Sequence, residues 1–207
     1  MTPFYSIGSR DFWLDLASAS GGGGGSTEDM IFISKSTASS SASLEITSGI
    51  DSTYDHYRIV LNAVRVATDG TKLECQFSSD GGTTYASNTA SAIWYSYNRI
   101  GVTASLGPET GDSRDNTWTG MNIISGAIGN DATHNMSGWL DLYIPSSTSL
   151  HKVCQSEVLG GNDLDGPVGV RADMIIYTTS AIDAIKFACN SGNIVSGDFI
   201  LYGYKDS

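Results

Sequence analysis

Residues 41–78, SASLEITSGIDSTYDHYRIVLNAVRVATDGTKLECQFS, contain three segments in which apolar and polar side chains alternate. In the last of them, KLECQFS at residues 72–78, Leu73, Cys75 and Phe77 fall on one face and polar residues fall on the other. SASLEIT and HYRIVLNAV follow the same period of two. Because successive side chains of a strand point to opposite faces, this period predicts three strands that each bury one face.

Strand-like runs of the same kind recur along the rest of the chain. Eight of them begin at residues 30, 91, 120, 138, 152, 172, 184 and 198. Asp69-Gly70 and Asp80-Gly81-Gly82 are turn signals, which we interpret as hairpin turns. About eleven short strands with frequent turns predict an all-β fold, an antiparallel β-sandwich or jelly roll. Residues 101–116 have only weak patterning, so we expect a long surface loop there.

The composition restricts the classes of partner. The chain has 207 residues, a net charge of −11 and 16% charged residues, and its eleven cations are scattered singly. This disfavours nucleic acid as a partner, because phosphate binding needs clustered Lys and Arg. No apolar run approaches the roughly 20 residues of a membrane-spanning helix. We therefore expect one globular domain with no nucleic-acid partner and no membrane insertion.

A glycine run divides the N-terminal region from the first strand. Residues 21–26, GGGGGS, predict a flexible linker between residues 1–20 and a sandwich domain at residues 27–207. Ser9 could cap a short helix that carries Phe12, Trp13 and Leu16 on one side. So short a helix is marginal alone, and we expect residues 1–20 to order as a helical or extended segment only against another molecule.

The cysteine pattern is typical of a chain made in a reducing cytoplasm. Cys75, Cys154 and Cys189 are odd in number, widely spaced and without a CxxC pair. We interpret them as buried thiols used as small apolar residues, with a disulfide or a reactive thiol as the alternative.

Catalytic motifs are missing from the sequence. The three histidines, His56, His134 and His151, have no metal-binding spacing, and there is no GxSxG motif or phosphate-binding loop. We therefore expect no enzymatic activity and no cofactor. Residues 78–85, SSDGGTTY, look like the Asp-box turn of sialidase-type propellers, but one copy is better interpreted as a structural hairpin.

Two other stretches contain candidate binding residues. Asn162, Asp163 and Asp165 lie in a glycine-bounded loop that could supply oxygen ligands to calcium, although a solvated acidic turn is the favoured interpretation.

The second stretch is IWYSYNR, residues 93–99. In it Tyr95, Tyr97 and Arg99 project to one side and could form a ligand platform or a subunit interface. The alternative is a core strand with Ile93 and Trp94 pointing inward.

Residues 36–85 resemble a recurrent module of tailed-bacteriophage virion proteins. The resemblance rests on TASSSAS, SGIDSTY and SSDGGTTY, and on residues 190–205, which are similar to the terminal hairpin of those modules. It implies a jelly-roll or carbohydrate-binding-like sandwich on a fibre or at the virion surface, often behind a glycine-rich connector. It carries over no catalytic residue, and residues 86–173 depart from the module most.

The resemblance leads us to expect a virion structural protein, made in the host cytoplasm. The first hypothesis is a tail-fibre or appendage component whose sandwich head binds the host surface, with a host surface glycan as the candidate ligand. The alternative is a capsid cement, or decoration, protein that stabilises the head, and a glycan-degrading enzyme is third. Residues 1–20 would anchor the chain to other virion proteins through Phe4, Tyr5, Phe12, Trp13 and Leu16. By analogy with other virion fibres and decorations we expect a homotrimer.

Overall fold

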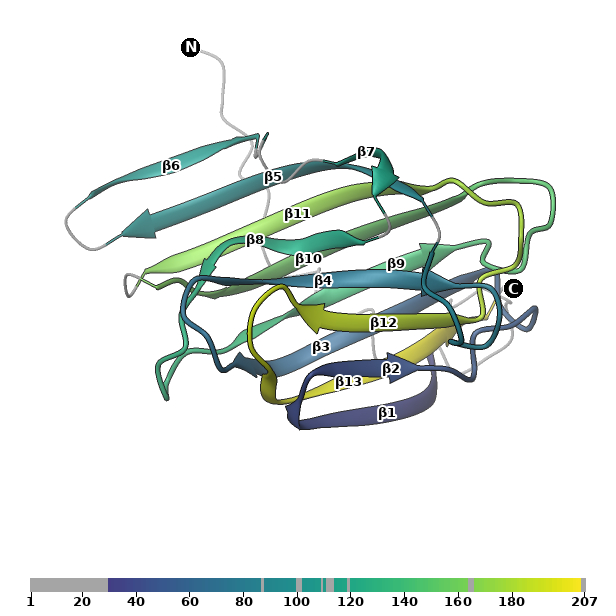
Figure 1. Cartoon of the computed structure of the whole chain (residues 1–207), viewed down its shortest axis with the longest axis horizontal. Helices are drawn as coiled ribbons and strands as arrows, with labels where there is room; N and C mark the ends of the chain where they lie inside the picture. Colours follow the sequence, from purple (N-terminus) through teal and green to yellow (C-terminus); the bar gives the residue numbers. More distant parts are fainter. Residues whose placement is uncertain are drawn as a thin grey trace, which may run out of the picture.

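The computed structural model describes residues 30–86, 88–99, 102–108, 110, 114–118, 120–163 and 166–205. The expected anchor and the glycine linker lie outside the described residues. The described chain is all-β and forms two antiparallel sheets packed face to face (Figure 1). The strands are β1 (Met30–Ser41), β2 (Ser43–Ile46), β3 (His56–Val66), β4 (Thr71–Ser78), β5 (Thr89–Arg99), β6 (Val102–Pro108), β7 (Arg114–Trp118), β8 (Met121–Ile128), β9 (Met136–Tyr143), β10 (Lys152–Gly161), β11 (Pro167–Ile176), β12 (Ala184–Cys189) and β13 (Ile194–Tyr204).

The strand order is that of a jelly roll with additions. The large sheet runs β1-β13-β3-β9-β10-β11-β5-β6, with β7 also paired to β5, and the small sheet runs β2-β12-β4-β8. If β5, β6, β7, β10 and β11 are set aside, the remaining eight strands form two four-stranded sheets, β1-β13-β3-β9 and β2-β12-β4-β8, in the two-Greek-key order of a jelly roll. The five added strands all extend one side of the large sheet.

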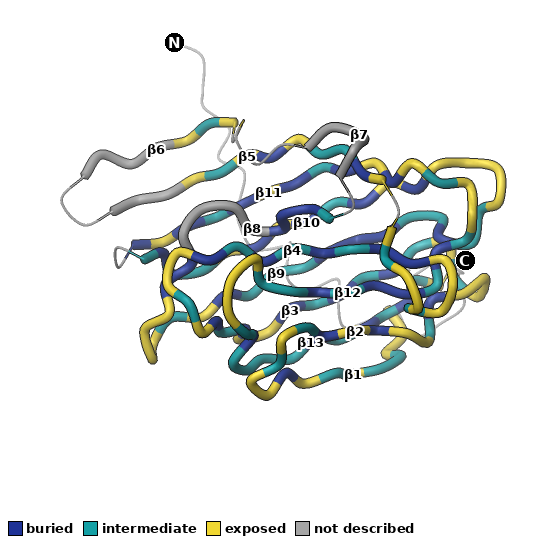
Figure 2. Tube along the Cα trace, in the orientation of Figure 1, coloured by how far each residue is buried: buried dark blue, intermediate teal, exposed yellow. Residues whose placement is uncertain are grey.

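The core lies between the two sheets. It contains Leu73, Cys75 and Phe77 of β4, all three fully buried, as the period-two pattern predicts. Phe187 of β12 packs on Phe199 of β13, with ring centroids 4.8 Å apart. Figure 2 shows buried residues along the strands of both sheets and exposed residues in the loops at the two ends.

All eleven expected strands are present, but the stretch at residues 101–116 is not a loop. It contains β6 and most of β7, which both pair with β5. β6 and β7 make their main contacts with β5 and not with the small sheet, so packing does not require either strand to alternate apolar and polar residues. This is why the sequence shows no strand pattern there.

The two turn signals connect sheets, not paired strands. Asp69-Gly70 lies between β3 of the large sheet and β4 of the small sheet, and Asp80-Gly81-Gly82 lies between β4 and β5 of the large sheet. The hairpin interpretation was therefore wrong at both. Gly70, Gly81 and Gly82 do have positive φ angles of 70°, 72° and 85°. Turn chemistry specifies a reversal of the chain, whereas the pairing of the flanking strands depends on distant contacts.

A buried lysine joins two loops at one end of the large sheet. Lys152, the first residue of β10, is fully buried. Its Nζ donates hydrogen bonds to the carbonyl oxygens of Ser147 and Leu150 at 2.6 and 3.2 Å, and to those of Thr178 and Ser180 at 3.2 and 2.6 Å. The ammonium group therefore ties the β9–β10 loop to the β11–β12 loop.

Candidate ligand-binding face

The added strands expose a broad face of the large sheet. We call the side of this sheet that points away from the small sheet the outer face. Directly paired residues of antiparallel strands share a face, so the register places their side chains in rows across it. Three such rows are Tyr204–His56–Tyr143–Val153–Ile175–Ala90, Arg58–Asp141–Gln155–Asp173–Ala92 and Trp139–Glu157–Arg171–Trp94.

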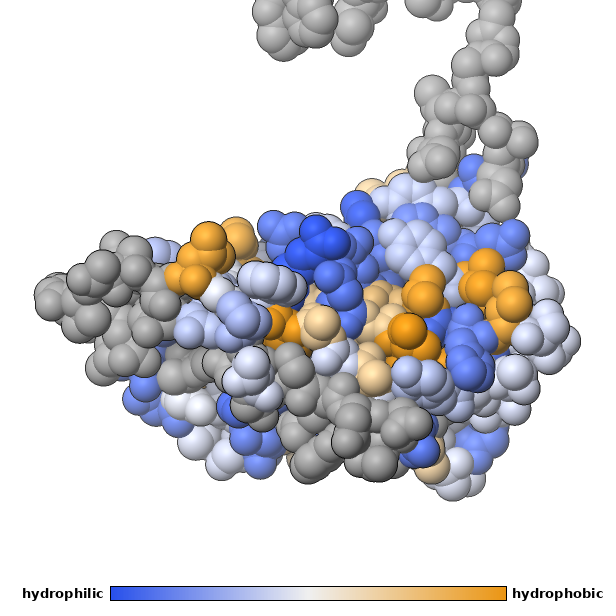
Figure 3. Space-filling view, turned by 90° about the horizontal axis from the view of Figure 1, so that it is seen from above, coloured by the Kyte–Doolittle hydropathy of each residue, from blue (hydrophilic) through white to orange (hydrophobic). Residues whose placement is uncertain are grey.

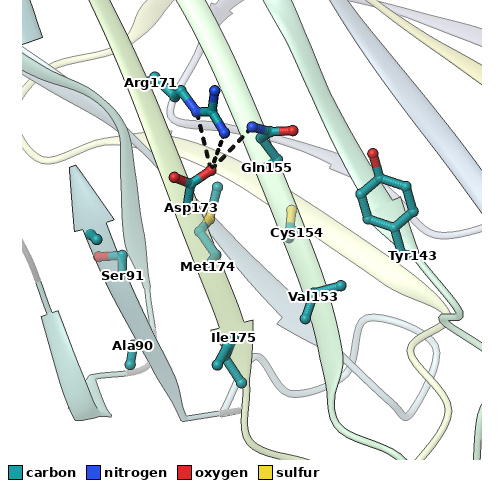
Figure 4. A pocket seen from close by; sticks show the side chains of 11 residues that line it. Ala90, Ser91, Tyr143, Val153, Cys154, Gln155, Arg171, Asp173, Met174 and Ile175 are labelled. Atoms are coloured by element: carbon teal, nitrogen blue, oxygen red, sulfur yellow. Dashed lines mark hydrogen bonds and ion pairs between the residues drawn. The ribbon is translucent and has the colours of Figure 1, made fainter. Parts of the chain in front are cut away.

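A hollow of about 530 Å³ lies on the part of the outer face formed by β9, β10, β11 and β5. We call it the larger hollow. Val153, Ile175, Ala90 and Ala92 give it an apolar floor, and Tyr143 stands at its side (Figure 4). The short side chains of the two alanines on β5 lower the floor relative to the neighbouring strands.

Polar side chains stand at one end of the larger hollow. Oδ1 of Asp173 accepts hydrogen bonds from Gln155 Nε2 at 3.1 Å and from Nε and Nη2 of Arg171 at 3.2 Å each (Figure 4). All three bonds converge on one oxygen. Within the described part of the chain, Oδ2 of Asp173 and Oε1 of Gln155 therefore keep their capacity to accept hydrogen bonds from a ligand.

A second, smaller hollow of about 170 Å³ adjoins the first and shares Arg171 with it. Trp94, Leu106 and Leu159 line it, and they are 51%, 80% and 62% exposed. Glu157 lies on its rim. Seen from the β5–β6 edge, the surface shows separate hydrophobic groups with hydrophilic side chains between them (Figure 3).

The outer face beside the larger hollow is held by a buried ion pair. Nε and Nη2 of Arg58 on β3 donate to the two carboxylate oxygens of Asp141 on β9, at 2.7 and 2.6 Å. His56 stacks between Tyr143 and Tyr204, with ring centroids 4.5 and 4.1 Å away. Tyr143 therefore belongs both to this cluster and to the wall of the larger hollow, and its ring is fixed by stacking.

The environment of Asp141 favours its charged form. Burial raises the pKa of this carboxyl, but the hydrogen bonds and positive charge of Arg58 and the proximity of His56 outweigh burial, and the net pKa is lowered. Nε2 of His56 lies 3.2 Å from Oδ1 of Asp141. Hydrogen bonding to Asp141 in turn raises the pKa of Arg58.

Tyr95, the one residue of the expected tyrosine platform whose side chain is described, points toward the core. Tyr95 is partly buried and packs against the core beside Ile93, whereas Trp94 lies on the outer face. The expected outward position of Tyr95 was therefore wrong, because the paired strand β11 places Val170 opposite Tyr95 on the core side and Arg171 opposite Trp94. The side chains of Tyr97 and Arg99 lie outside the described set.

In the candidate calcium loop, Asn162 closes the turn between β10 and β11. Asn162 is buried between β10 and β11, and its Oδ1 accepts the backbone N–H of Gly166 at 3.0 Å. Asp163 is partly exposed, and Asp165 lies outside the described residues. Within the described residues, no group of three or more His, Cys, Asp or Glu side chains is arranged to hold a metal ion.

The turn at residues 78–85 has a dense local hydrogen-bond network. Asp80 Oδ1 accepts from the backbone N–H of Thr84 at 2.8 Å, and Oδ2 accepts from the Thr84 hydroxyl at 2.6 Å. The side-chain and backbone hydrogen bonds from Thr84, with that from Ser78, lower the pKa of Asp80 to about 2. Every oxygen of the carboxylate serves the turn, so its role is structural.

The three cysteines are free thiols. Cys75 and Cys154 are buried, Cys189 is partly buried, and burial raises the pKa of each thiol, that of Cys189 to about 11. A high pKa disfavours the nucleophilic thiolate, which fits the expected role as small apolar residues.

Few of the residues that line the hollows could be identified from the sequence. Val153, Gln155 and Leu159 come from KVCQSEVLGG, in which buried positions alternate with exposed or partly exposed ones up to Leu159, and apolar residues occur at both kinds of position. One detectable signal of a binding site is present on β11. Arg171, Asp173 and Ile175 lie on the same face of this strand and combine a positive, a negative and an apolar side chain. Only the pairing of β10, β11 and β5 brings these side chains together.

Comparisons with known proteins leave the chain without a family assignment: no family model matches it, and no curated protein or solved structure shows significant similarity to it. The described part of the chain contains no helix long and apolar enough to cross a membrane.

Proposed function

We propose that the chain is a structural protein of a tailed-bacteriophage virion, and that its sandwich is the host-binding head of a tail fibre or another appendage. The observation that carries the binding role is the outer face of β10, β11 and β5, where an exposed indole and exposed aliphatic side chains surround ordered polar groups. Hollows with an apolar floor and a few converging polar groups are typical of ligand-binding sites. The virion assignment rests on the sequence resemblance of residues 36–85 and 190–205.

The position of this face within the fold supports the proposal. The added strands share the core with the eight jelly-roll strands through their inner face, and they carry more of the exposed large apolar side chains than those eight strands do. Those on or next to the added strands are Trp94, Leu106, Val153, Leu159, Ile175 and Tyr177. Several exposed large apolar side chains gathered on one part of a fold favour an interaction site, because their burial would stabilise a complex.

We expect the chain to assemble into the virion through its N-terminal segment, with the glycine linker between this anchor and the sandwich head. Residues 1–20 would bind other virion proteins through Phe4, Tyr5, Phe12, Trp13 and Leu16, and the glycine linker would let the head take a different orientation from its anchor. A homotrimer is the proposed state of the head, and light scattering at micromolar concentration measures it. A monomer mass would contradict the trimer without affecting the binding face.

Particles that carry Trp94→Ala test the binding role. We expect at least a several-fold loss of adsorption to host cells, with unchanged assembly and heat resistance. Phe32→Ala is the matched control, because Phe32 on β1 is a similarly exposed aromatic residue, 59% against 51%, at the opposite end of the same sheet. Normal adsorption of the Trp94→Ala particles, together with bursting on mild heating, would favour the capsid-cement alternative. Release of reducing sugars from host polysaccharide by the purified protein would favour an enzyme.

A further inference from the structure

We propose that the two adjoining hollows bind a neutral oligosaccharide that contains an acetamido sugar, with the acetamido group in the larger hollow and a neighbouring sugar ring on Trp94. This inference rests on the proposed host-binding function and specifies the ligand class of the same face.

The smaller hollow has the composition of a sugar-stacking site. The C–H face of a pyranose ring is apolar and flat, and it packs on an exposed aromatic ring while its hydroxyls reach sideways to polar groups. Trp94 offers such a ring, half exposed on the outer face. Arg171 is its direct cross-strand partner, and Glu157 follows on β10, so a donor lies beside the indole and an acceptor lies one strand further along the same row.

The larger hollow fits an acetamido group better than a plain hydroxyl. Its floor of Val153, Ile175, Ala90 and Ala92 offers an apolar contact to a methyl group. Oε1 of Gln155 and Oδ2 of Asp173 can each accept the amide N–H, and Arg171 can donate to the amide oxygen. A hydroxyl in the same place would leave the apolar floor facing water.

The two hollows are spaced for neighbouring units of one chain. Ala92 on the floor and Trp94 in the smaller hollow lie two residues apart on the same face of β5, which corresponds to about 7 Å along a strand. That separation is on the scale of one sugar unit. Arg171 lines both hollows and can contact both units.

The charge of the protein favours a neutral ligand. The chain carries a net charge of −11, and Glu157 and Asp173 add negative charge beside the hollows. A polyanionic glycan would be repelled by this field, whereas a neutral N-acetylated sugar would not.

The first experiment compares two trisaccharides with the full-length protein. The β-1,4-linked trimer of N-acetylglucosamine and the β-1,4-linked trimer of glucose differ at each unit only in an acetamido group that replaces a hydroxyl. We expect NMR titration or calorimetry to show binding of the N-acetylglucosamine trimer about ten-fold tighter than that of the glucose trimer, from one buried methyl group and one added hydrogen bond. Failure of the acetamido trimer to bind, or equal binding of the two trimers, would overturn the inference.

Two variants assign the hollows. Ala92→Leu fills the larger hollow from an exposed position, so we expect it to remove the preference for the acetamido trimer and to leave the fold unchanged. Trp94→Ala should weaken both trimers about ten-fold, while Phe32→Ala should weaken neither. Unchanged affinities in Ala92→Leu and Trp94→Ala would place any binding elsewhere and contradict the inference.

The particle experiment separates this inference from the proposed function. If Trp94→Ala particles lose adsorption but neither trimer binds, the host-binding role stands and the acetamido ligand is wrong. If the acetamido trimer binds at these hollows but Trp94→Ala particles adsorb normally, the sugar site stands and the host-binding role is wrong.

Discussion

Arg58 and Asp141 face each other across β3 and β9 and form a two-point ion pair, with nitrogen–oxygen distances of 2.7 and 2.6 Å. The carboxylate is only 2% exposed although it lies on the outer face, because Arg58 and the rings around it cover it. The guanidinium in turn lies over Trp139 and Tyr204, 4.6 and 5.4 Å from their ring centroids. Arg58 and the rings beside it therefore cover the Asp141 carboxylate on the part of the outer face next to the larger hollow.

Arg58→Met should lower the free energy of unfolding by about 2–4 kcal/mol, because it leaves a buried carboxylate without its main partner. The pKa of Asp141 should then rise, so the deficit should shrink as the pH falls and the carboxyl becomes protonated. Urea unfolding at pH 7 and pH 4 measures both effects. Arg58→Met/Asp141→Asn, which removes both charges, should recover part of the loss. No recovery in the double variant would show that Arg58 acts through its packing on Trp139 and Tyr204.

Lys152→Met should destabilise the protein by about 3–5 kcal/mol at neutral pH. The change removes the shared donor of four loop carbonyl oxygens, so the two loops lose the hydrogen bonds that join them. Amide hydrogen exchange should rise first at residues 144–151 and 177–183. Lys35→Met is the control, since Lys35 forms an exposed ion pair with Asp198 at 3.2 Å and should cost less than about 1 kcal/mol. Equal losses in the two variants would contradict the structural role of Lys152.

Asp80→Asn should reduce the dependence of stability on acid pH. The folded-state pKa of Asp80 is about 2, below the roughly 3.9 of an unfolded aspartate. Its contribution is therefore fully present above about pH 4 and is lost as the pH falls through about 2. The variant should have a lower Tm than the wild type at pH 7 and a similar Tm near pH 2. Asp55→Asn, at an exposed aspartate whose side chain has no hydrogen bond within the described residues, should follow the wild-type curve. Parallel curves for Asp80→Asn and the wild type would contradict the prediction.

The sequence predicted strands reliably where one face of a strand is buried. Leu44 and Ile46 of β2 alternate with polar residues because only one face of the small sheet meets the core. β6 and β7 were missed because their main contacts are with β5 and not with the small sheet, so packing between the sheets does not impose alternation on them. Local pattern thus reports burial of a face, and it says nothing of which strands pair.

The candidate site was less predictable than the fold for the same reason. Trp94 and Tyr95 are adjacent aromatic residues, and their sequence does not say which of the two belongs to the core. That choice follows from the register with β11, which sets Arg171 opposite Trp94. The ion pair of Arg58 and Asp141 joins residues 83 positions apart, so neither partner could be identified from its local sequence.

Deletion of residues 1–20 should leave the sandwich folded but abolish attachment to the virion. The described residues form a continuous core of their own between Ala38 and Leu201, and we expect this core to fold without the first 20 residues. The glycines of residues 21–26 give the backbone wide freedom and should decouple the two parts mechanically. Binding of Phe4, Tyr5, Phe12, Trp13 and Leu16 to another virion protein would bury five large side chains, at about 1.5–3 kcal/mol each, which offsets the entropy of ordering the segment.

We therefore expect the truncated protein to keep its Tm and its affinity for the ligand of the outer face while its occupancy on purified particles falls to background. Trp13→Ala/Leu16→Ala in the full-length chain should reproduce the loss of occupancy without a deletion. Normal occupancy of the truncated protein on particles would contradict the anchor and would place the attachment surface on the sandwich itself.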